Sequence, residues 1–183
     1  RVPLWNPYDN LGIPLAANPT SSVWYPAKLL FCLPISFEWA YRIYVIGHVF
    51  LAAAAAYRLA RHWRAGPEAA TLAAISHAFC GPVLYQYANI VFLVGAAWLP
   101  LALAAADVML RQSSVRHAML FGLTLAMMVL GGEPQTAYHT LFLAALYWLM
   151  VVRVEHPPAD RVGLGLWRTW IGPMGLFTVA GAT

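Results

Sequence analysis

Charged side chains are scarce in this chain, at 10% of its 183 residues, whereas an average soluble domain carries about 25%. Hydrophobic residues make up 61%, and the mean hydropathy is +0.63. These proportions exclude an ordinary soluble domain and indicate an integral membrane protein. The net charge of +4 comes from scattered arginines, with Lys28 as the single lysine. No basic patch forms, so we expect no nucleic-acid partner.

Cysteines and catalytic motifs are scarce as well. The two cysteines, Cys32 and Cys80, lack the close spacing of zinc ligands. We expect small packing residues, with a disulfide as the alternative if both lie near the outer face. The sequence contains no HExxH, CxxC, GxSxG or P-loop pattern, so no motif predicts a metal site or a nucleotide loop.

Long apolar runs are what the chain has in abundance. After residue 36 they recur at lengths that approach or reach the width of a bilayer. We expect five complete spans and a truncated sixth, at residues 37–61, 68–83, 89–110, 115–130, 136–152 and from 164 onward. The predicted fold is an all-α polytopic transmembrane helix bundle over residues 37–183. Residues 1–36 form an extracytoplasmic loop that includes a short interfacial segment, 27–34.

Arginines predict the orientation of this bundle, because they favour the cytoplasmic side. They cluster after the first, third and fifth spans: Arg58, Arg61 and Arg64, then Arg111 and Arg116, then Arg153, Arg161 and Arg168. All three connections can be cytoplasmic together, which places the N-terminal loop and the turn at residues 131–135 outside. The chain starts at Arg1 and stops at Thr183 within an apolar segment, so we expect a fragment of a longer protein.

The polar stretch at residues 4–26 gathers candidate chemistry ahead of an apolar bundle. Asp9 could serve as a general base or hold a metal, although an Asx turn is the simpler interpretation. Asn6, Tyr8 and Asn18 are candidates for binding a sugar, with the Tyr8 ring able to stack on it. This stretch is therefore the first half of the predicted site.

The second half is the sequence GGEPQ at residues 131–135. Glu133 is a candidate catalytic carboxylate, and Gln135 and His139 share a helix face on which they could bind sugar hydroxyls. The alternative for Glu133 is an acid placed near a helix N-terminus, where the dipole favours it. We interpret the three side chains as lining the entrance of the bundle.

Two residues of the first span could contact a lipid phosphate. The planar guanidinium of Arg42 matches phosphate oxygens, but Glu38 is four residues earlier and could form a helix ion pair with it. His48 lies near the middle of the span, where an ionisable residue suggests function. The alternative is a neutral histidine that is hydrogen-bonded to a neighbouring helix.

Four motifs together resemble the YfhO family of bacterial membrane proteins. They are PLWNPYDNLGIPLAANPTSSVWYP at residues 3–26, His48 with Tyr57, AWLPL at residues 97–101, and GGEPQ. In the family the last turn often reads GGHPQ, so Glu133 stands here in place of a histidine. The family is similar to the GT-C glycosyltransferases that use polyprenyl-phosphate sugars.

The resemblance implies a multi-pass protein of the bacterial cytoplasmic (inner) membrane with its N-terminal loop outside. It would transfer a sugar from a polyprenyl-phosphate donor to a cell-envelope glycan acceptor, with inversion and within a membrane lipid environment. The principal catalytic acid is expected upstream of Arg1, so the fragment alone is expected to be inactive. Some relatives bind a divalent cation. The alternatives are a non-catalytic membrane subunit of a larger complex and a transporter.

Overall fold

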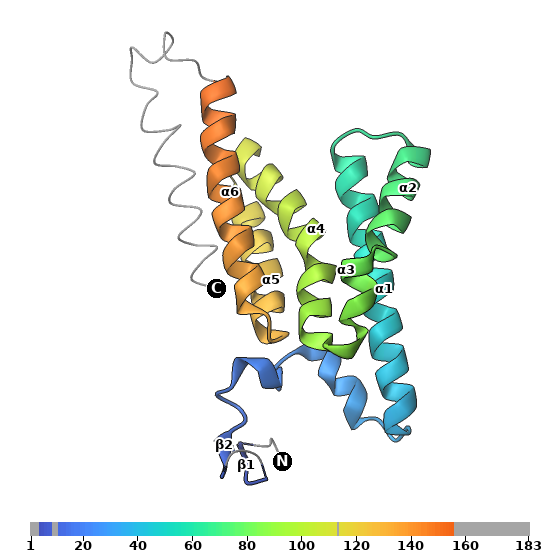
Figure 1. Ribbon diagram of the computed structural model, residues 1–183. Coiled ribbons are helices and arrows are strands. Elements are labelled where there is room, and N and C mark those ends of the chain that lie inside the picture. The colour runs from blue at the N-terminus through green and yellow to red at the C-terminus, as the bar shows by residue number, and fades with distance from the viewer. Residues whose placement is uncertain (1–3, 9–10, 113, 156–183) are drawn as a thin grey trace.

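The computed structural model describes residues 4–8, 11–112 and 114–155, which are mainly helical (Figure 1). The α-helices are α1 (Phe37–His62), α2 (Pro67–Ala78), α3 (Gly81–Tyr85), α4 (Ile90–Gln112), α5 (Val115–Leu130) and α6 (Pro134–Glu155). Short 3-10 helices are η1 (Pro19–Ser21), η2 (Pro26–Cys32) and η3 (Gln86–Ala88). Strands β1 (Trp5–Asn6) and β2 (Ile13–Pro14) form a small antiparallel pair. The expected sixth span and Asp9 lie outside the described residues.

The helices alternate in direction, so the bundle has two distinct ends (Figure 1). The connections α1–α2 and α4–α5 lie at one end; Arg64 belongs to the first connection, and Arg116 is the second residue of α5. The N-terminal stretch and the turn before α6 lie at the other end. The connections at which the arginines cluster thus share one end of the bundle, as the sequence predicts. The side of a membrane that each end faces stays a prediction.

Helix α4 is the centre of the bundle, because it packs against α1, α5 and α6. Small buried residues such as Ala97, Ala102 and Ala106 line it, and small side chains let helix backbones approach closely. On the side toward α5 and α6, the larger buried side chains of Met109 and Phe121 fill the core.

Two of the described helices, α1 and α4, are long and apolar enough to cross a membrane. The expected bounds of the first and third spans match them within two residues, and α5 coincides with the expected fourth segment but has only 16 residues. The expected span 68–83 is wrong, because the chain bends at Cys80 (ψ 152°) and splits into α2 and α3. Pro82 in the first turn of α3 has no N–H to continue the preceding helix. The count of five spans stays a prediction.

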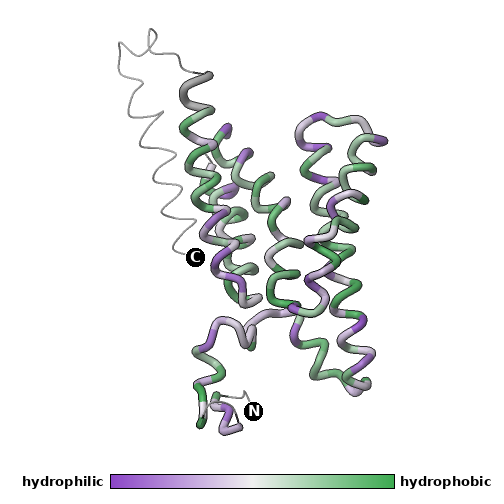
Figure 2. The backbone as a smooth tube through the Cα atoms, in the orientation of Figure 1, coloured by the Kyte–Doolittle hydropathy of each residue, from purple (hydrophilic) through white to green (hydrophobic). Residues whose placement is uncertain are grey.

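Hydrophobic residues recur along the helices (Figure 2), and many of their large side chains are exposed. On α1, Ile46 and Phe50 are 67% and 74% exposed. The short apolar run at 27–34, expected to be interfacial, forms η2 and packs beside the first half of α1.

Candidate functional site

The N-terminal polar stretch docks against the turn that precedes α6. The hydroxyl of Ser22 donates to the carbonyl oxygen of Gly131 at 2.6 Å, and this contact is buried. Gly132 has a φ of 95°, and a Cβ there would lie 2.6 Å from the Ser22 hydroxyl. Only glycine fits this conformation and this space without strain. The structure therefore brings together the two polar segments that the sequence analysis singled out.

Glu133 lies inside this junction rather than in an open site. Its side chain is buried, and its Oε1 accepts hydrogen bonds from the Thr136 backbone N–H at 3.1 Å and from the Thr136 hydroxyl at 3.0 Å. The carboxylate thus caps the N-terminus of α6, which begins at Pro134. A Cβ on Gly95 would lie 2.6 Å from the Glu133 Cγ, so α4 makes room for this side chain. The interpretation as a helix-terminal acid is favoured.

Glu133, Gln135 and His139 do not line one entrance together, so the prediction of a single cluster is wrong. Glu133 is buried toward α4, while Gln135 and His139 are exposed on α6. The reason is that the capping geometry turns the Glu133 carboxylate back onto its own helix. Gln135 and His139 keep the shared face that their spacing predicts, and their role as sugar-binding residues stays a prediction.

The candidate sugar-binding residues of the N-terminal stretch mainly shape its turns. Asn6 Oδ1 accepts from the Tyr8 backbone N–H at 3.1 Å. Asn18 Oδ1 accepts from the backbone N–H and the hydroxyl of Thr20, at 3.1 and 2.8 Å. Such local bonds are the usual work of asparagine in turns. Tyr8 is 96% exposed and available to a ligand.

Arg42 forms an ion pair with Glu38 on the exposed surface of α1. The guanidinium carbon of Arg42 also lies 5.3 Å from the ring centre of Trp39. The helix ion pair that was the alternative for Arg42 is therefore present. A contact with lipid phosphate stays a prediction.

His48 is buried in a hydrogen-bonded chain that joins three segments. Its Nδ1 lies 2.7 Å from the Tyr44 carbonyl oxygen, and its Nε2 lies 2.8 Å from the Tyr25 hydroxyl. A carbonyl can only accept, so Nδ1 carries the proton and Nε2 accepts from Tyr25. The Tyr25 oxygen in turn accepts from Trp98 Nε1 at 2.9 Å. Both ring nitrogens of His48 are used inside the protein, which favours its interpretation as a bonded neutral histidine.

An apolar groove, the α1 groove, opens beside this chain. It has a volume of about 920 Å³ and is lined by residues within 25–33 and 43–54, by Trp98 and by Met127. Tyr44 lines it, and its buried hydroxyl has no hydrogen-bond partner among the described residues. The Lys28 ammonium lies 5.6 Å from the Tyr44 ring centre. The sequence analysis missed Tyr25, Tyr44 and Lys28; the only signals were a lone lysine and the four-residue spacing of Tyr44 and His48.

Burial changes the proton affinity of two groups at this groove. Burial raises the pKa of the Tyr25 hydroxyl, and the hydrogen bond from Trp98 lowers it by a smaller amount. Burial lowers the pKa of the Lys28 ammonium, because a charge is less stable away from water. Tyr25 therefore keeps its proton, and Lys28 loses its charge at a lower pH than an ordinary lysine.

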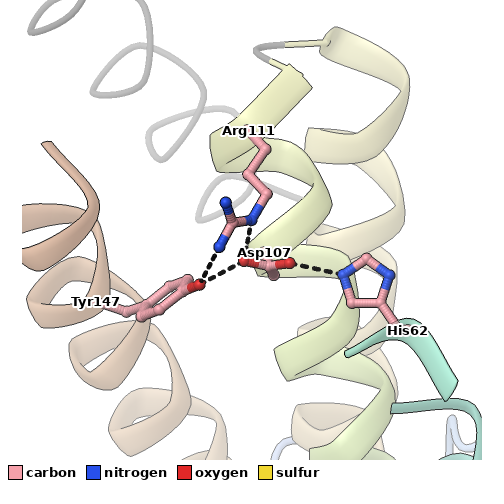
Figure 3. Close-up of polar contacts among 4 residues, drawn as sticks. All are labelled: His62, Asp107, Arg111 and Tyr147. Atoms are coloured by element: carbon pink, nitrogen blue, oxygen red, sulfur yellow. Dashed lines mark hydrogen bonds and ion pairs between the residues drawn. The ribbon is translucent and has the colours of Figure 1, made fainter. Parts of the chain in front are cut away.

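A second polar cluster, which the sequence analysis also missed, joins α1, α4 and α6 near the arginine-bearing end (Figure 3). Asp107 of α4 is buried, and its Oδ2 lies 2.6 Å from His62 Nε2. Its Oδ1 accepts from Arg111 Nε at 2.8 Å and from the Tyr147 hydroxyl at 2.6 Å. Arg111 also donates to the Tyr147 oxygen at 2.9 Å. Both carboxylate oxygens are engaged, so this cluster ties helices together.

Over residues 4–8, 11–112 and 114–155, no three His, Cys, Asp or Glu side chains come close enough to hold a metal ion. Two candidate sites therefore remain among the described residues: the junction of Ser22 with Gly131, and the α1 groove with its unpartnered Tyr44 hydroxyl. No family model matches this chain, and comparisons with curated proteins and with solved structures likewise give no match.

Proposed function

We propose that this chain is part of a membrane glycosyltransferase that moves a sugar from a polyprenyl-phosphate donor to a cell-envelope acceptor. The observation that carries the proposal is the junction of Ser22 with Gly131. It fixes a polar, turn-rich segment on one end of an apolar helix bundle, where a membrane enzyme must meet water-soluble groups. The sequence resemblance to the YfhO family covers the same two segments.

The arrangement of the two ends supports this proposal. The orientation expected from arginine places the junction on the outer face of the bacterial inner membrane. Exposed polar side chains there, Tyr8, Gln135 and His139, are the groups available to a sugar. Glu133 then acts by positioning α6 rather than as the principal acid of the reaction.

The test is sugar transfer by the full-length protein in membrane vesicles, using a radiolabelled polyprenyl-phosphate sugar. We expect Gln135→Ala and His139→Ala each to lower the rate about two- to tenfold, because each variant removes a hydrogen bond to the sugar that contributes about 0.5–1.5 kcal/mol. Tyr85→Ala is the matched control, because Tyr85 is 83% exposed and lies outside the proposed site. Unchanged rates in both variants, at equal expression, would remove these residues from the site.

A non-catalytic subunit is the second candidate, and one observation favours it. Three of the acids that the structure describes are engaged in structural contacts: Glu38 pairs with Arg42, Asp107 is the centre of the second polar cluster, and Glu133 caps α6. This candidate predicts that the full-length protein lacks transfer activity with every polyprenyl-phosphate sugar tested. It also predicts stoichiometric co-purification with larger membrane proteins.

A further inference from the structure

The α1 groove has the length of one bilayer leaflet. Along α1 it is lined by Ile43, Gly47, Leu51 and Ala54, which share one face of the helix. From residue 43 to residue 54 an α-helix rises about 16 Å. Half of the hydrocarbon core of a bilayer is about 15 Å thick. An extended acyl chain from one leaflet therefore matches the groove in length, whereas a polyprenyl chain is several times longer.

One hydrogen-bond donor lines the end of the groove nearest the start of α1, and a cation lies beside it, because Lys28 falls between the lining residues Ala27 and Leu29. Tyr44 adjoins Ile43, and its hydroxyl is buried without a partner among the residues described. Leaving such a group unpaired costs about 1–3 kcal/mol, so it indicates an acceptor that comes from a ligand. Lys28 supplies the charge: its ammonium lies 5.5 and 5.6 Å from the ring centres of Phe31 and Tyr44. The described ion pairs do not include it.

The surroundings of this end fit a membrane interface. The first turns of α1 carry Trp39, Arg42 and Glu38 on the exposed surface, and aromatic and charged residues are typical of that zone. Beyond them, the groove is bordered by apolar side chains such as Phe50. The charge and the free donor are therefore at headgroup depth, and the apolar lining continues toward the centre of the bilayer.

We propose that the α1 groove is a binding site for an anionic phospholipid. One acyl chain lies along α1 between residues 43 and 54, and a phosphate oxygen accepts hydrogen bonds from the Tyr44 hydroxyl and the Lys28 ammonium. The site does not depend on sugar transfer, so it stands whether or not the glycosyltransferase proposal does.

The experiment is native mass spectrometry of the 183-residue chain, purified from micelles that contain equal amounts of phosphatidylglycerol and phosphatidylcholine with the same chains. We expect phosphatidylglycerol to be retained about tenfold over phosphatidylcholine. Lys28→Gln and Tyr44→Phe should each reduce this preference at least threefold. In lipid-free detergent, Tyr44→Phe should melt at or above the wild-type temperature, because it removes an unpaired buried hydroxyl. A merely structural hydroxyl would instead lower that temperature.

A second pair of variants tests the position of the chain. A Cβ on Gly47 would meet no heavy atom within 4 Å, so Gly47→Phe can fold and fill the groove. We expect it to remove bound lipid of both kinds. Ile46→Phe is the matched control, because Ile46 is the adjacent exposed residue and does not line the groove. It should leave lipid retention unchanged.

Several outcomes would overturn the proposal. Equal lipid retention in Gly47→Phe and Ile46→Phe would show that the groove is not where the lipid binds. An absence of preference for phosphatidylglycerol in the unmodified chain would remove the role of Lys28. Displacement by a polyprenyl phosphate at a far lower mole fraction would assign the groove to an isoprenoid carrier. A change of oligomeric state in Gly47→Phe, without loss of lipid, would assign it to a second copy of the chain.

Discussion

Replacing Asp107 with alanine removes the centre of the cluster that ties α1, α4 and α6. Three hydrogen bonds to a carboxylate are lost, from His62, Arg111 and Tyr147. Removing one partner from a fully buried ion pair costs about 3–5 kcal/mol. Here the His62 and Arg111 side chains are 30% and 48% exposed, so both recover solvation when the acid is gone. We therefore expect a smaller loss, of about 2–3 kcal/mol.

The assay is thermal unfolding of the purified chain in detergent. For a protein of this size about 1 kcal/mol corresponds to roughly 2–4 °C, so the melting temperature should fall by about 4–12 °C. Asp107→Asn keeps one acceptor oxygen for Arg111 and Tyr147. Its melting temperature should therefore fall by about half as much as that of Asp107→Ala. Arg58→Gln is the control, because it removes an exposed charge on α1. If Asp107→Ala melts at the same temperature as this control, the cluster does not hold the helices together.

Two further variants and one pH series test the other contacts. Tyr25→Phe should lower the free energy of unfolding by about 1–3 kcal/mol, because it leaves His48 Nε2 without its donor. Titration with urea or detergent measures this change. An unchanged midpoint would contradict the hydrogen bond between Tyr25 and His48. Gly95→Ala should cost about 1–3 kcal/mol through its clash with Glu133, and the same substitution should cost much less in a Glu133→Ala background, as a double-mutant cycle would show. The preference for phosphatidylglycerol should decline as pH rises, because the charged form of Lys28 binds the lipid. The decline should come at a lower pH than an ordinary lysine would give, because burial lowers the pKa of Lys28. Native mass spectrometry across a pH series checks this, and a preference that persists above the pH at which an ordinary lysine loses its charge refutes it.

The bounds of the long helices could be predicted because they depend on local signals. The apolar run at 115–130 coincides with α5, and Pro134 opens α6 as a first-turn proline does. The failure at residues 68–83 has a local cause as well. Apolar composition continues through Cys80, but Gly81 and Pro82 favour a new helix start over a continuous one. A run of hydrophobic residues thus predicts burial or lipid contact more reliably than it predicts an unbroken helix.

The site could be predicted only in part, because its decisive contacts join residues far apart in the chain. Tyr25 and Trp98 are separated by 73 residues, and Asp107 finds His62 and Tyr147 at separations of 45 and 40. No periodicity links such residues. For Glu133, the sequence left two interpretations open, and the capping bonds to its own helix favour the helix-terminal acid. Composition shows that polar groups exist, and packing alone shows which of them are satisfied.

The polar cluster around Asp107 also bears on the order in which the protein is made. His62 is synthesised before Asp107, and Arg111 follows it within one helical turn, so two partners are at hand as α4 leaves the ribosome. Tyr147 emerges 40 residues after Asp107. An acid in an apolar helix is unfavourable in lipid until it is paired. Arg111 of the same helix already opposes the charge on Asp107, so the arrival of α6 adds the last hydrogen bond to the carboxylate, from Tyr147.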